Sequence, residues 1–148
     1  MAGKPLKLSR PIRMKLREAR IAHLATSDAR GRPHVVPVCF AFDGKTFFTA
    51  IDQKPKRVMH QQLARVRNIE ATPAVALVID HYQEDWTRLW FVLVRGQAKL
   101  MPRSAGRERM KAIRMLRKKY PQYAAGMLRD EAPVIRITPK RVTSWGKL

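Results

Sequence analysis

The sequence has one cysteine, few acidic residues and no long apolar run, and each shortage excludes a class of protein. A single cysteine, Cys39, excludes an internal disulfide, and this is typical of proteins from a reducing compartment such as the cytoplasm. Only 11 Asp and Glu stand against 31 Lys and Arg, which argues against a hydrolase built on paired carboxylates. No apolar run approaches the roughly 18 to 20 residues of a membrane span, and the N-terminus lacks the apolar segment of a secretory signal.

The sequence also lacks the common catalytic and nucleotide-binding motifs. It contains no GxSxG nucleophile elbow, no Walker lysine loop and no GxGxxG fingerprint. None of the four histidines has metal-ligand spacing to another histidine or to Cys39, so we predict no metal site. If the protein is an enzyme, a bound cofactor is therefore expected to supply the chemistry.

Positive charge is abundant, and it is concentrated near the two ends of the chain. The formal charge is +20; residues 1–20 carry seven Lys or Arg and one Glu, and residues 103–148 carry thirteen and three acids. Such a field attracts polyanions, including phosphorylated cofactors and nucleic acid. A basic nucleic-acid-binding module using residues 1–20 and 103–120 is one interpretation. Solvated helix faces are the favoured one, because the same segments carry apolar stripes.

Residues 34–57 predict two strands joined by a tight turn and followed by a basic helix start. Apolar residues alternate along the first strand at Val36, Val38, Phe40 and Phe42. Asp43-Gly44 favours a two-residue turn because both residue types tolerate positive φ. Residues 46–51 make the second strand. Cys39 alternates onto the opposite face and is predicted to be a buried, inert thiol.

The basic helix start is the strongest candidate for an anion site. Pro55 suits the first turn of a helix, so Lys54, Lys56 and Arg57 would surround free backbone N–H groups at the positive end of the helix dipole. This arrangement predicts a phosphate cradle. A solvated basic helix start without a ligand is the alternative, and these residues alone do not separate the two.

The remaining segments predict a single domain, residues 1–148, with mainly β structure. Expected helices, with caps at Ser9 and Ser104, cover residues 10–20, 55–68, 105–119 and 122–128. Expected strands cover residues 21–26, 74–79, 89–100, 133–138 and 141–145, the second buried on both faces and the third with a bulge or a bend at Gly96. About six mostly antiparallel strands with flanking helices favour an α+β fold, a closed or half-open β-barrel.

The segment 80–90, DHYQEDWTRLW, gathers acids and aromatic rings in a chain that is short of acids. One interpretation is a structural lock, in which Glu84 or Asp85 pairs with Arg88 or with an arginine near a chain end, and the tryptophans join the core. The other is a wall that holds a flat ring against a tryptophan face. We favour the lock, because large aromatic residues in small domains mostly supply core area.

Two segments, ARIAHLATSDARGRPHVVPVCFAFDGKTFFTAIDQKPKR and DHYQEDWTRLWFV, resemble the flavin split-barrel proteins related to pyridoxamine 5'-phosphate oxidase. The resemblance extends from about residue 20 to residue 145. More narrowly, the chain is similar to the coenzyme F420-dependent oxidoreductases of that superfamily, with KPKR and DHYQEDWTRLW the segments most specific to the subgroup. The resemblance implies a homodimer of six-stranded, FMN-binding-like split barrels with two cofactor sites at the subunit interface.

The resemblance also implies an activity. It is hydride transfer between the deazaflavin ring of coenzyme F420 and an unsaturated organic substrate, in the cytoplasm. An oxidase or reductase that uses flavin mononucleotide (FMN) on the same barrel is the first alternative, and a cofactor carrier is another. The substrate is not specified by any residue, and no catalytic residue is named.

By position, the resemblance implies three groups of cofactor-binding residues. The first group lies along the ring and its edge: Val36, Pro37, Val38, Thr49 and Ala50. The second group holds the phosphate: Lys54, Lys56 and Arg57. The third group approaches from the barrel wall or from the partner subunit: Trp86, Arg88 and Trp90. For the first group, ordinary strand packing is the alternative interpretation.

Overall fold

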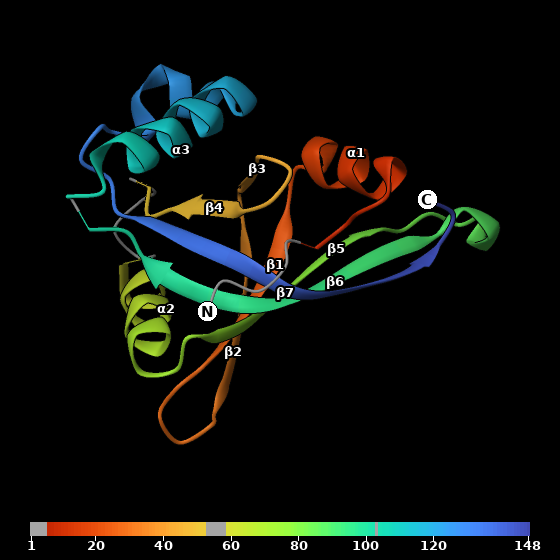
Figure 1. The fold of residues 1–148 in the computed structure, drawn as a ribbon, viewed down its shortest axis with the longest axis horizontal. Coiled ribbons are helices and arrows are strands. Elements are labelled where there is room, and N and C mark those ends of the chain that lie inside the picture. Colours follow the sequence, from red (N-terminus) through yellow and green to blue (C-terminus); the bar gives the residue numbers. More distant parts are fainter. Residues whose placement is uncertain (1–5, 53–58, 103) are drawn as a thin grey trace.

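The protein is built around one curled antiparallel sheet of seven strands (Figure 1). The computed structural model describes residues 6–52, 59–102 and 104–148. The strands lie in the order β2-β1-β5-β6-β7-β4-β3. Their bounds are Ala22–Ser27 (β1), Pro33–Val38 (β2), Ala41–Phe42 (β3), Phe47–Ala50 (β4), Ala74–His81 (β5), Trp90–Leu100 (β6) and Val134–Gly146 (β7).

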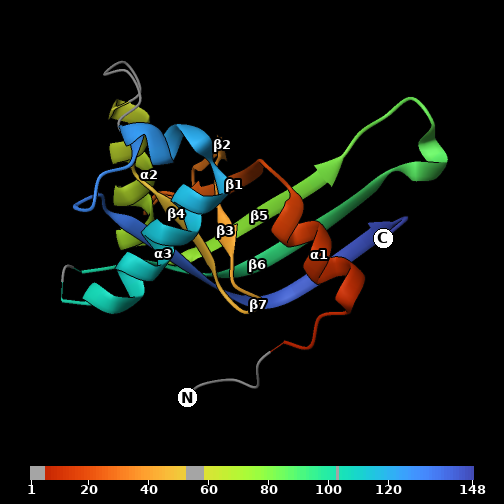
Figure 2. The same cartoon turned by 90° about the horizontal axis from the view of Figure 1, so that it is seen from above.

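In the described parts of the chain, three α-helices lie around the curled sheet (Figure 2). They are α1 (Arg10–Glu18), α2 (Met59–Ala71) and α3 (Gly106–Lys119), and short helical turns cover Trp86–Arg88 and Tyr123–Met127. None of the described helices is long and apolar enough to cross a membrane. The prediction of a mainly β, α+β fold with a half-open barrel and flanking helices is confirmed.

The predicted strand through Val36 and Phe42 is wrong in one respect, because it is broken at Cys39 and Phe40. Among the described strands β2 pairs with β1 alone, and β3 pairs with β4 at the opposite edge of the sheet. The Phe40 backbone N–H donates instead to the Tyr120 hydroxyl, which lies 3.1 Å from the Phe40 carbonyl oxygen. The break is stable because this side chain from the end of α3 satisfies both backbone groups.

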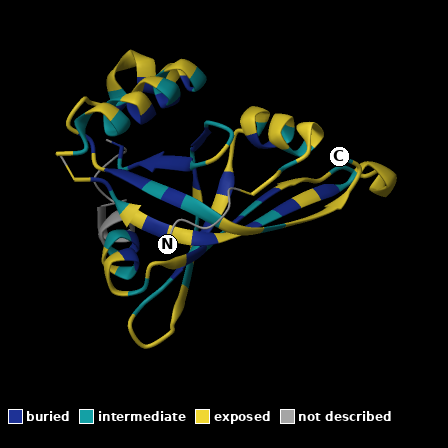
Figure 3. Ribbon diagram, viewed as in Figure 1, coloured by how far each residue is buried: buried dark blue, intermediate teal, exposed yellow. Residues whose placement is uncertain are grey.

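Two apolar cores form on either side of the short strands β3 and β4. The first fills the curl of the sheet and includes Phe40, Phe47, Leu24, Leu77, Ile79, Val92 and Ile135. The second lies against α3 and includes Phe48, Ile113, Leu116, Tyr120, Tyr123 and Val134. Figure 3 shows buried and exposed positions alternating along the long strands, so one face of each packs inward.

Several local predictions are corrected. Ser9 caps α1 as expected, but α3 has Ala105 at its N-cap position and no side-chain cap. The strand expected to be buried on both faces, β5, is buried on one face only. The expected turn at Asp43-Gly44 has positive φ only at Gly44. The two short strands expected after residue 132 are one long strand, β7.

Gly96 marks the expected bulge, where the register between β6 and β7 shifts. A Cβ atom at Gly96 would lie 2.3 Å from the Thr138 carbonyl oxygen. Gly96→Ala is therefore expected to lower the free energy of unfolding by about 2 kcal/mol, because backbone must move to admit the methyl group. Urea denaturation measures the change. Gly106→Ala is the control, since a Cβ there meets no atom within 4 Å; equal destabilisation by both variants would contradict this explanation.

Candidate functional site

The residues predicted to lie along a cofactor ring are on β2, which forms one edge of the sheet. β2 pairs with β1 through Val36–Leu24, Pro37–His23 and Val38–Ala22, and no described strand lies along its other edge. Pro37 is exposed, while Val38 is buried and Val36 is half-buried. Because the two valine side chains point into the core, the open backbone edge is the part of β2 that a planar ligand can contact.

Thr49 and Ala50 lie at the end of β4, and the structure ties this end to the end of β2. The Thr49 hydroxyl donates to the Cys39 carbonyl oxygen at 2.8 Å. Both residues are buried, at 2% and 4% exposure, so in one chain their side chains pack as ordinary strand residues. Cys39 itself is half-buried rather than fully buried. The backbone after Val38 is thus close to Thr49, as a shared ring site requires.

The predicted phosphate cradle, Lys54, Lys56 and Arg57, lies outside the described residues, as does the expected helix start at Pro55. The described chain reaches Asp52 just after β4 and resumes at Met59, where α2 begins. The cradle stays a prediction from the sequence.

A buried polar cluster next to this segment was not foreseen. The Tyr123 hydroxyl donates to the Asp52 carboxylate at 2.5 Å, and both side chains are buried together with Arg65 of α2. Burial lowers the pKa of Arg65 and the Asp52 charge opposes that shift. Burial and then the Asp52 hydrogen bond raise the pKa of Tyr123. Arg65 is only 7% exposed and therefore does not face solvent.

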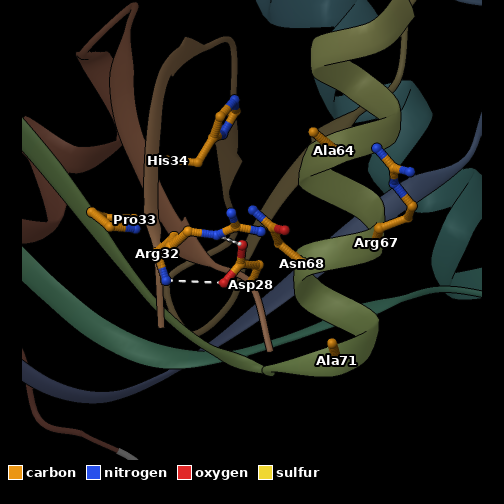
Figure 4. A pocket seen from close by; sticks show the side chains of 8 residues that line it. All are labelled: Asp28, Arg32, Pro33, His34, Ala64, Arg67, Asn68 and Ala71. Carbon is orange, nitrogen blue, oxygen red and sulfur yellow. Dashed lines mark hydrogen bonds and ion pairs between the residues drawn. The ribbon is translucent and has the colours of Figure 1, made fainter. Parts of the chain in front are cut away.

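A pocket of about 480 Å³ lies between the start of β2 and α2 (Figure 4). Arg32 and His34 face it from β2 and the turn before it, and Arg67 and Asn68 line it from α2. Asp28 holds Arg32 in place, since its carboxylate lies 2.6 Å from Arg32 Nε and accepts the Arg32 backbone N–H. Those hydrogen bonds lower the pKa of Asp28.

His34 gives this pocket an unsatisfied polar atom. Its Nδ1 is buried and has no hydrogen-bond partner among the described residues, and such an atom is costly unless a ligand or water pairs with it. His34 is two residues before Val36 and therefore faces the same side of β2. The pocket therefore lies beside the start of the strand that carries the predicted ring contacts. The signal in the sequence was a histidine at a strand start, preceded by Arg30 and Arg32.

The third predicted group lies at the far end of the sheet. Trp86 is 69% exposed in the turn between β5 and β6, and Trp90 is buried in the first core with Lys15 Nζ 5.4 Å from its ring centroid. Asp85 accepts from the Thr87 backbone and hydroxyl, and no ion pair of Asp85 or Glu84 with Arg88 is seen in the described chain. The lock interpretation is therefore confirmed for Trp90, which joins the core. It is wrong for Trp86, which is exposed.

The position of this turn decides how it can contribute to a site. Figure 2 shows the β5–β6 turn extending away from α2. Within one chain, Trp86 and Arg88 are not brought to β2 and β4. Their predicted role requires a second subunit and stays a prediction. No group of three metal-ligating side chains is found in the part of the chain that the structure describes.

Comparison with known proteins identifies relatives of this chain. Residues 8–146 match the family model for pyridoxamine 5'-phosphate oxidase. The chain is 33% identical over 135 residues to a 5a,11a-dehydrotetracycline/5a,11a-dehydrooxytetracycline reductase of Streptomyces rimosus subsp. rimosus, with 88% of this chain and 78% of the relative covered.

Solved structures share the curled sheet at lower identity. The heme storage protein HutZ of Vibrio cholerae superposes with a TM-score of 0.71 at 19% identity over 95% of each chain. An F420 reductase superposes with a TM-score of 0.60 at 23% identity over 92% of this chain and 98% of the other. These likenesses concern the fold alone. Because the family model matches nearly the whole chain and the reductase is one-third identical, the protein belongs to the pyridoxamine 5'-phosphate oxidase family.

Proposed function

We propose that this protein is a cytoplasmic oxidoreductase that binds the deazaflavin coenzyme F420 and transfers hydride to an unsaturated organic substrate. The observation that carries the proposal is the 33% identity to a reductase over 88% of the chain. The choice of coenzyme F420 rests on the subgroup resemblance of the KPKR and DHYQEDWTRLW segments, and a protein named F420 reductase shares the fold. FMN is the alternative ring cofactor.

The open edge of β2 fits a planar ring. A sheet edge presents backbone N–H and C=O groups, and these can hydrogen-bond the polar edge of a deazaflavin or a flavin. Pro37 has no backbone N–H, so one position along this edge lacks a hydrogen-bond donor. Thr49, whose hydroxyl donates to the Cys39 carbonyl oxygen at 2.8 Å, would bound the ring on the side of β4. The proposed ring site therefore lies between the end of β2 and the end of β4.

The pocket along α2 fits the anionic part of the ligand. Arg67 and the unsatisfied His34 Nδ1 supply polar groups, while the Asp28 carboxylate neutralises Arg32. Lys54, Lys56 and Arg57 remain the proposed cradle for the phosphate. Coenzyme F420 continues beyond its phosphodiester into a polyglutamate tail, and a chain of charge +20 suits such a polyanion.

The bound ring would supply the hydride chemistry, and the chain's own residues would orient the reactants and exclude water. A homodimer is part of the proposal. The outer face of the sheet exposes Val35, Phe91 and Trp145, and the rings of Phe91 and Trp145 stack at 5.8 Å. A second subunit covering this apolar face would also bring its Trp86 and Arg88 near a neighbouring site. Sedimentation of the purified protein as a monomer would contradict this part.

The test is a titration of the purified protein with coenzyme F420 and, separately, with FMN, followed by ring fluorescence at moderate salt. Tight binding of the deazaflavin is expected. Tight binding of FMN, without binding of coenzyme F420, would change the proposed cofactor to a flavin. Binding of neither, together with steep salt-dependent binding to nucleic acid, would instead support the basic binding module.

A further inference from the structure

A second pocket lies between α1, β3 and α3, and it shares no lining residue with the pocket along α2. Its volume is about 550 Å³, within the range of small-molecule sites. Ala41, Phe42 and Met115 give it an apolar floor. Both strand residues are at least nine-tenths buried, so the floor belongs to the packed body of the fold. We call this pocket the α1–α3 groove.

Hydrogen bonds join α3 to the segment after α1 and to the turn after β3, beside the α1–α3 groove. At one end, the Tyr120 hydroxyl lies 2.8 Å from the Arg20 carbonyl oxygen and accepts from the Phe40 N–H at 3.0 Å. Arg20 also donates to the Lys119 carbonyl oxygen at 2.7 Å. At the other end, Lys111 donates to Asp43 at 3.2 Å. The position of α3 relative to the segment after α1 and to the turn after β3 is therefore set before any ligand arrives, which lowers the entropic cost of binding.

The walls of the groove carry an excess of positive charge. Asp43 is the acid among the lining residues, and its carboxylate is already engaged by Lys111 and by the backbone N–H groups of Lys45 and Thr46. Arg17, Lys118 and Lys119 complete the lining. Three cations beyond the Lys111–Asp43 pair thus surround an apolar floor.

Lys119 is the most unusual of these cations. Its Nζ is buried and has no hydrogen-bond partner among the described residues, and it lies 3.9 Å from the centroid of the Phe40 ring. Burial, with the nearby Arg20 charge second, lowers the pKa of Lys119 to about 8. A desolvated, unpaired cation beside a preformed pocket is the pattern expected where a ligand supplies the missing negative charge.

We propose that the α1–α3 groove binds a small organic anion with an apolar ring, in which the ring lies on Phe42 and Met115 and the anionic group reaches Arg17 and Lys119. The geometry favours this class because apolar floor and cationic walls meet in one cavity. Inorganic phosphate lacks the apolar part, and an uncharged ring lacks the partner for Lys119. This site is separate from the proposed cofactor site and does not depend on it.

The test uses 2-naphthoate as the probe and its neutral analogue 2-naphthamide as the comparison. Titrations follow the Met115 methyl signal by NMR in protein labelled at methionine methyl groups, with Met115→Leu identifying that signal. We expect 2-naphthoate to shift the Met115 signal and to bind about tenfold or more tightly than 2-naphthamide, because one hydrogen bond to a charged group contributes at least that factor. Inorganic phosphate alone is expected to bind more weakly than 2-naphthoate.

Two variants localise the binding, and a third serves as the matched control. Lys119→Met keeps the apolar stem and removes the charge, and Arg17→Gln removes the second cation without a cavity. Each is expected to weaken 2-naphthoate binding about tenfold, while Lys99→Met, an exposed lysine on β6, leaves it unchanged. Unchanged affinity in Lys119→Met and Arg17→Gln, an unmoved Met115 signal, or displacement of the probe by coenzyme F420 would each overturn the proposal.

Discussion

Asp52→Asn is expected to lower the free energy of unfolding by about 3 kcal/mol, because it leaves the buried Arg65 cation without its nearby negative charge. Asp52 and Arg65 are 6% and 7% exposed, and the Asp52 charge counteracts the effect of burial on the pKa of Arg65. Asparagine keeps the shape and can still accept the Tyr123 hydroxyl hydrogen bond. The decrease in the free energy of unfolding should therefore reflect removal of the negative charge. Chemical denaturation followed by circular dichroism measures it.

Two comparison variants separate this explanation from a general loss of packing. Asp130→Asn removes an acid whose side chain is 63% exposed and lies 2.7 Å from Arg117, and it should cost less than about 1 kcal/mol. Adding Arg65→Met to Asp52→Asn should restore part of the stability, because the uncompensated cation is gone. If Asp52→Asn costs no more than Asp130→Asn, the buried charge pair is not a major source of stability.

Lys56→Ala combined with Arg57→Ala is expected to weaken cofactor binding about 100-fold or more. Each substitution removes a cation from the proposed phosphate cradle, and a hydrogen bond to a charged group contributes about 1.5–3 kcal/mol. The unfolding free energy should change by about 0.5 kcal/mol or less, because in this proposal the two cations contact the ligand and not the core. The measurement is the dissociation constant from ring fluorescence, for coenzyme F420 and for FMN.

The matched control is Arg107→Ala with Arg114→Ala, which removes two exposed cations of α3. The control lowers the net charge equally, so it reports how much affinity comes from the general field of the protein. Equal losses in the two double variants would assign the binding energy to that field. Unchanged affinity in Lys56→Ala with Arg57→Ala would remove the cradle assignment.

Much of the fold could be predicted because its signals are local. The alternation in residues 89–100 and the glycine at position 96 predict β6 and its bulge, since side-chain period and backbone freedom are properties of the strand itself. The residue patterns in the two quoted segments also identify the family, which the match over residues 8–146 confirms. Local periodicity and motif similarity need no knowledge of distant contacts.

The errors arise where a distant residue decides the outcome. Alternation from Val36 to Phe42 favours one strand, yet the chain leaves the sheet at Phe40 because Tyr120, eighty positions later, satisfies its backbone. Trp86 and Trp90 lie in the same aromatic-rich segment and cannot be distinguished by local sequence, but of the two Trp90 is buried and Trp86 is exposed. Pairing partners and burial depend on which elements meet.

The sequence by itself determined most of the strands, the excess of positive charge and the family, and the cradle stays a prediction from the sequence. Only the tertiary structure decided that Asp52, Arg65 and Tyr123 share one buried cluster and that Lys119 faces a groove formed with α1. These groups are far apart in the chain, so no spacing rule links them. They interact because the curled sheet and the packing of α1, α2 and α3 remove them from water together, and burial makes each charge depend on its neighbours.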